Sequence, residues 1–172
     1  MKIQQLVRRT MSLLALALFL VTALRVSPAA AARPSRVLLS QGPITISRVC
    51  AFDVQSTPTA SKEYLTTFTD KNGAVTMQIV TGAFKVKLTN LSTGYSQDLN
   101  ISGPGKIRYN PDGSGEFMST GAGLVWGISG LTNLPALAFF HGRLTIQFDS
   151  QGNIIATSFN GQVTDECAAL NH

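Results

Sequence analysis

The chain has 172 residues, of which 44% are hydrophobic and 13% charged, and this composition excludes intrinsic disorder and predicts a well-filled core. The formal net charge is +5, but four basic residues and no acidic residue fall within the first 32 positions. Beyond those positions the charges nearly balance, with 10 basic against 9 acidic residues. We therefore expect no nucleic acid as a partner.

Residues 1–32 have the order of features that is typical of a secretory signal peptide. Arg8 and Arg9 precede an apolar run over residues 11–24, and four consecutive alanines follow at 29–32. A spanning helix needs roughly 20 apolar residues, so we expect no stable membrane span after signal removal; an uncleaved N-terminal anchor is the alternative. The predicted location is secreted, extracellular, or the periplasmic or envelope space if the source is bacterial.

Residues 33–43 show no clear hydrophobic period, and we expect a mobile leader there. From residue 44 to residue 172 the pattern has a period of two, which predicts a single β domain. Apolar and polar residues alternate most clearly over 84–89 and 143–149. One apolar and one polar face are typical of antiparallel strands with one solvated side.

Turn-forming residues separate these alternating runs at intervals typical of all-β proteins. We predict an all-β antiparallel meander of about nine to eleven strands that closes into a small barrel, because closure removes exposed edges. A β-sandwich is the alternative. The turns are expected at residues 70–73, 90–94, 110–113, 149–152 and 160–161.

The only two cysteines, Cys50 and Cys167, are predicted to form a disulfide. An isolated cysteine pair in an exported chain normally does so, because the compartment is oxidising. We expect the bond to join the first strand to the last, with Cys167 following a hairpin at Asn160-Gly161, and so to support barrel closure.

Residues 117–140 contain no charged side chain and include the only tryptophan. One interpretation is a buried strand, a loop that caps the barrel, and a second strand. The other is a mobile apolar lid over a ligand cavity, because lids often hinge at glycines and barrel mouths are common ligand sites. On the second interpretation the residues that bind an apolar ligand are Trp126, Phe139, Phe140 and His141.

No catalytic, nucleotide or metal motif is present, so we expect no catalytic residue, cofactor or metal.

The sequence favours a secreted, non-enzymatic β-barrel that binds a small apolar ligand or a surface partner. The first alternative is a small secreted enzyme of the isomerase or cyclase type, which needs inward polar groups in a barrel pocket. The second is a structural protein of the cell envelope. The side chains to examine for the enzyme are His141, Tyr64, Tyr95, Tyr109 and Glu116.

The order of features resembles that of uncharacterised exported bacterial β-proteins. The shared features are the signal, the Cys50-Ala51-Phe52 unit, the 88–94 turn, the 149–152 hairpin and a Val-Thr-Asp-x-Cys close at 163–167. The resemblance covers most of the chain after the signal. It implies export and a β architecture, and it brings no known activity.

Overall fold

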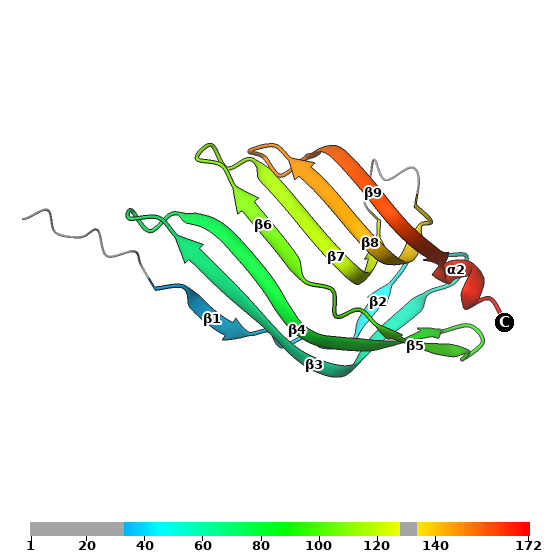
Figure 1. Ribbon diagram of the computed structural model, residues 1–172. Coiled ribbons are helices and arrows are strands. Elements are labelled where there is room, and N and C mark those ends of the chain that lie inside the picture. Colours follow the sequence, from blue (N-terminus) through cyan, green and yellow to red (C-terminus); the bar gives the residue numbers. More distant parts are fainter. Residues whose placement is uncertain (1–32, 128–133) are drawn as a thin grey trace, which may run out of the picture. The chain divides into compact units, whose positions relative to one another are not determined.

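The computed structural model describes residues 33–127 and 134–172, which form one antiparallel sheet of nine strands. The predicted signal peptide lies outside these residues. The main strand order is β1-β3-β4-β6-β7-β8-β9, while β2 also pairs with β3 and β5 with β4 (Figure 1). The strands are β1 (Ser35–Leu38), β2 (Ile44–Ile46), β3 (Val54–Thr69), β4 (Val75–Asn90), β5 (Ser96–Asn100), β6 (Gly105–Tyr109), β7 (Gly115–Trp126), β8 (Leu137–Phe148) and β9 (Ile154–Asp165).

The all-β prediction and the expected strand number are confirmed. The alternation in β4 buries Phe84, Val86 and Leu88, and it exposes Lys85 and Lys87 between them. The turns at 70–73, 110–113 and 149–152 are tight connections closed by backbone hydrogen bonds, each supported by an aspartate oxygen that accepts from a backbone N–H. Within the predicted leader, β1 pairs antiparallel with β3, so part of that segment is regular structure.

Strands β3 and β4 are long, bent, and paired with different neighbours along their length (Figure 1). The early part of β3 pairs with β2 and its later part with β1. In the same way, β4 pairs first with β6 and then with β5. The two strands thus connect one part of the sheet, which carries β2 and β5, to a second part that continues through β6 to β9.

The predicted hairpin at Asn160-Gly161 is wrong. Both residues lie inside β9, and Gly161 pairs with Gly142 of β8, which pairs in turn with Gly121 of β7. All three glycines have positive φ. A β-carbon at Gly161 would lie 2.1 Å from the His141 carbonyl oxygen, so neighbouring backbones approach too closely here for a side chain. We call Gly121, Gly142 and Gly161 the glycine row; in it, Gly142 and Gly161 allow β8 and β9 to approach closely.

The sheet is open, and the predicted closed barrel is not found. Strands β1 and β9 end the main strand order and do not pair with each other.

The disulfide between Cys50 and Cys167 is confirmed, with a Cα–Cα distance of 5.4 Å. It does not close two strands, however, because Cys50 lies in the connection from β2 to β3 and Cys167 lies in a short helix, α2 (Glu166–Ala169).

The main hydrophobic core forms where α2 and the ends of β7 and β8 pack against β2 to β5. Asp165 caps the helix by accepting hydrogen bonds from Cys167 N and Ala168 N. Leu170 is fully buried in this core, and Asn90 Nδ2 donates to its carbonyl oxygen over 3.1 Å. Within residues 33–127 and 134–172, no helix has the length and apolar character that crossing a membrane requires.

Candidate functional site

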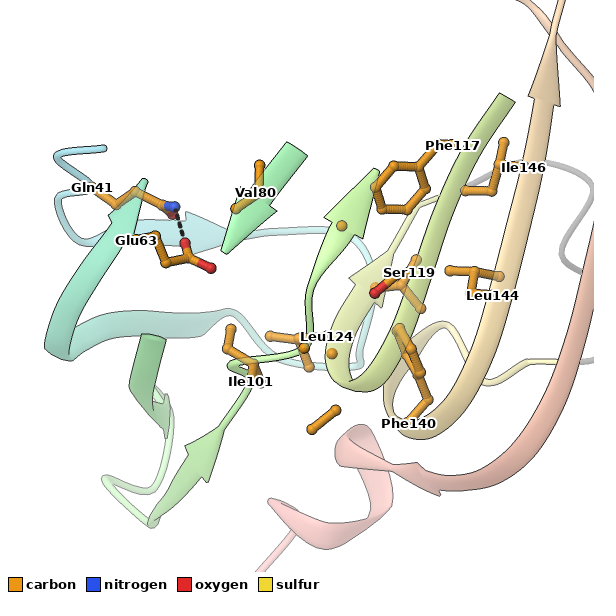
Figure 2. Close-up of a pocket in the computed structure, with 15 residues that line it drawn as sticks. Gln41, Glu63, Val80, Ile101, Phe117, Ser119, Leu124, Phe140, Leu144 and Ile146 are labelled. Atoms are coloured by element: carbon orange, nitrogen blue, oxygen red, sulfur yellow. Dashed lines mark hydrogen bonds between the residues drawn. The ribbon is translucent and has the colours of Figure 1, made fainter. Parts of the chain in front are cut away.

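A pocket of about 360 Å³ lies between β3–β4 on one side and β7–β8 on the other (Figure 2). This volume is near the lower end of the range for small-molecule sites. Eight of its lining residues have large apolar side chains. These are Val80, Ile101, Phe117, Leu124, Val125, Phe140, Leu144 and Ile146.

Strand alternation explains why one wall of the pocket is apolar. Leu144 and Ile146 are two positions apart on β8 and point to one face of the sheet. Their register partners on β7 are Ser119 and Phe117, which face the same side. Figure 2 shows these four side chains together on the β7–β8 wall. Alternation on two neighbouring strands thus gives the pocket a largely apolar wall, with Ser119 as its one polar side chain.

Two glycines allow neighbouring parts of the pocket lining to pack closely together. A β-carbon at Gly123 would lie 2.5 Å from the Phe140 ring, so the ring occupies space that a side chain at position 123 would fill. At Gly103 a β-carbon would lie 2.2 Å from the Ala122 carbonyl oxygen, and Gly103 N donates to that same oxygen over 2.8 Å. The connection before β6 therefore lies directly against β7 and carries Ile101 to the pocket.

The opposite wall carries a carboxyl group, Glu63 of β3, whose side chain points toward the pocket (Figure 2). Its exposed fraction is only 6%. Gln41 Nε2 donates to Glu63 Oε2 over 3.1 Å, and burial raises the pKa of the Glu63 carboxyl above its ordinary value. An apolar pocket with a few polar groups is the usual composition of a small-molecule site.

Of the four residues predicted to bind a ligand, Phe140 lines this pocket. Phe139 packs against the main core, and His141 is exposed and makes an edge-to-face contact with Phe139 at a ring-centroid distance of 4.9 Å. Trp126 ends β7 with 38% of its surface exposed and does not line the pocket. Residues 128–133, in the middle of the segment interpreted as a lid, lie outside the described residues.

The polar side chains considered for an enzyme do not line the pocket. The Tyr109 hydroxyl donates to Gln78 Oε1 over 3.0 Å, Tyr64 stacks under the Arg36 guanidinium, and Tyr95 is 44% exposed. Glu116 lies in a second, more polar depression of about 370 Å³ near the 110–114 turn. These residues are therefore dispersed over the sheet and do not form one cluster.

The sequence analysis did not identify Glu63 or Gln41, the two polar residues on the β3 side of the pocket. Glu63 lies in a mixed stretch, Ser61-Lys62-Glu63-Tyr64, that has no apolar alternation to indicate an inward position. Gln41 lies in the segment interpreted as a leader, but Leu39 N donates to the Glu63 carbonyl oxygen over 2.8 Å and fixes this segment beside β3. One feature of the sequence did point to this region. Gly82 interrupts a clear strand pattern, and a glycine in a strand often marks a place where a neighbouring backbone approaches closely.

A second buried carboxyl group, Glu166, lies at the start of α2. It is fully buried, and neither carboxyl oxygen has a hydrogen-bond partner among the described residues. Burial and the nearby Asp165 charge both raise the pKa of Glu166 above its ordinary value of 4.5. Across residues 33–127 and 134–172, no group of three or more His, Cys, Asp or Glu side chains could hold a metal ion.

We expect Glu166→Gln to stabilise the protein at pH 8. Because the folded state favours the protonated carboxyl, the wild type loses stability as pH rises from the unfolded pKa through the folded pKa, and the amide variant does not. The melting temperatures of the two proteins, measured from pH 4 to pH 8, should converge at the acidic end. A difference that is independent of pH would contradict this explanation.

Comparison with known proteins returned no match, whether with family models, curated proteins or solved structures. The resemblance to exported bacterial β-proteins therefore stays a prediction, and any function must be argued from the residues of this chain.

Proposed function

We propose that this chain is an exported, non-enzymatic β-protein that binds a small apolar molecule in the pocket between β3–β4 and β7–β8. The observation that carries the proposal is the pocket of about 360 Å³, with its apolar wall on β7–β8 and its single carboxyl group on β3. A folded protein gains nothing in stability from an unfilled apolar pocket, because the lining atoms lose packing partners. A ligand that fills it restores those contacts and removes apolar surface from water.

Export is supported by two independent features. The first 32 residues have the pattern of a signal peptide, and the Cys50–Cys167 bond fits a non-reducing environment such as the extracellular space. Binding is preferred to catalysis because the polar groups that an isomerase or cyclase would need are spread over the sheet. The pocket offers one carboxyl group, one amide and one hydroxyl, from Glu63, Gln41 and Ser119.

We expect Ser119→Phe to abolish binding of N-phenyl-1-naphthylamine, a neutral fluorescent probe. Ser119 is 7% exposed and lines the pocket, so a phenyl ring at this position occupies the space that the probe needs. At roughly 0.3 kcal/mol for each of about 17 heavy atoms, the wild type should bind the probe with a Kd of about 0.2 mM or tighter. The measurement is probe fluorescence during titration with protein.

The matched control is Thr120→Phe, which adds the same ring at the next, exposed position of β7. It should leave binding unchanged. If Ser119→Phe does not fold, as judged by circular dichroism, the smaller Ser119→Leu takes its place with a partial loss expected. Unchanged probe binding by a folded pocket variant would overturn the proposal, as would the absence of binding by the wild type.

A further inference from the structure

The Glu63 carboxyl is the one ionisable group among the described residues that line the pocket. It is 6% exposed, and the neutral Gln41 amide donates a hydrogen bond to its Oε2. The adjacent Lys62 side chain is exposed, because successive residues of a strand point to opposite faces. The chain therefore places a carboxyl group at an apolar pocket and supplies no cation beside it from among the lining residues.

The neighbouring strand leaves this carboxyl uncovered. The register partner of Glu63 on β4 is Gly82, which has no side chain. A β-carbon at Gly82 would lie 2.1 Å from the Lys62 carbonyl oxygen and 2.8 Å from Glu63 Cα. No larger residue fits there without backbone movement, so β4 supplies no side chain at the position opposite Glu63 that could pair with its carboxyl group.

On the basis of the proposed function, we infer that the ligand is a small apolar amine whose protonated amino group pairs with the Glu63 carboxylate. Burying a carboxylate is costly unless it is paired and hydrogen-bonded. A cation in the pocket offsets this cost with a charge-assisted hydrogen bond, which is about twice as strong as a neutral one. The apolar body of the ligand then contacts the opposite wall, where Phe117, Leu144 and Ile146 lie (Figure 2).

An alcohol of the same shape satisfies the apolar wall equally well but leaves the carboxylate without a counter-charge. A carboxylic acid of the same shape places two like charges in one apolar pocket, which disfavours binding. The order of affinity should therefore be amine, then alcohol, then acid. Because burial raises the pKa of Glu63, measurements at pH 8 favour the ionised carboxyl.

The test compares 1-aminoadamantane, 1-adamantanol and 1-adamantanecarboxylate by isothermal titration at pH 8. For the wild type, we expect the amine to bind at least tenfold more tightly than the alcohol. Glu63→Gln should lower amine affinity to that of the alcohol, because the amide carries no charge to pair with the ammonium group. Asp98→Asn removes an exposed negative charge from β5 and is the control for general electrostatic attraction; it should keep the amine preference.

Equal affinities of the amine and the alcohol for the wild type would overturn the inference without requiring any variant. An amine preference that persists in Glu63→Gln would overturn it as well, because the charge would then be recognised elsewhere. In both cases continued binding of N-phenyl-1-naphthylamine would leave the proposed function standing. A separate result would reject the proposed function: if the wild type does not bind that neutral probe, the pocket is not a binding site for apolar molecules.

Discussion

Replacing Cys50 with Ser is expected to lower the free energy of unfolding by about 4–5 kcal/mol, the upper figure of the chain-entropy model for a loop of this size. The bond joins residues separated by 117 positions and therefore restrains nearly the whole β domain. It also fixes α2 and the buried Leu170 that follows the helix and belongs to the main core. The corresponding fall in melting temperature is roughly 10–20 °C.

Cys167→Ser should cause the same loss, and the double variant should lose little more, because either single change already removes the whole cross-link. Ala168→Ser is the matched control, since it places the same hydroxyl at an exposed position next to Cys167. Thermal unfolding with and without a reducing agent checks the result: the reductant should lower the melting temperatures of the wild type and of Ala168→Ser, and leave those of the cysteine variants unchanged. Clearly additive losses in the double variant would show that the two residues act separately.

Gly161→Ala is expected to lower the free energy of unfolding by about 2–6 kcal/mol. A β-carbon there would lie 2.1 Å from the His141 carbonyl oxygen and 2.7 Å from Gly142 Cα. The φ of Gly161 is 154°, which residues with a side chain rarely adopt. Backbone strain of about 1–3 kcal/mol and overpacking of similar size therefore add. Chemical denaturation measures the loss.

Gly152→Ala separates these two contributions. Gly152 also has positive φ, at 84°, but a β-carbon there would have no atom within 4 Å. Its substitution should therefore cost only the backbone strain. If Gly161→Ala is no more destabilising than Gly152→Ala, the close approach of β8 and β9 at the glycine row is not a significant constraint.

The structural features that depend on a local pattern of residues are predicted correctly from the sequence. Alternation over 84–89 places the right side chains of β4 in the core, and the Asp-x-x-Gly segments form the expected turns. The two cysteines pair as predicted. Local pattern cannot distinguish two uses of glycine, however. Asn160-Gly161 has the composition of a hairpin turn. In the structure, however, Gly161 adopts its positive φ inside a continuous strand, opposite Gly142.

Closure and the site depend on pairing between distant residues, which no local pattern contains. Whether the first and last strands meet is decided by the curvature of the whole sheet, so an even meander pattern fits an open sheet as well as a barrel. Glu63 and Gln41 meet at the pocket because Leu39 fixes the segment that carries Gln41 beside β3. Phe140 was predicted from the uncharged run alone, whereas its partners on β7 follow from the register.

The most direct test of the central claim is methyl NMR of the folded protein during titration with N-phenyl-1-naphthylamine. The pocket carries methyl groups on three strands and on the connection before β6. Exposed methyl groups elsewhere serve as internal controls, including those of Val37, Ile155 and Val163. We predict that resonances of Val80, Ile101, Leu124, Leu144 and Ile146 shift together and saturate with one dissociation constant while the controls stay in place. Shifts confined to the exposed methyl groups, or no saturable shift in the pocket, would contradict the assignment of this pocket as the binding site.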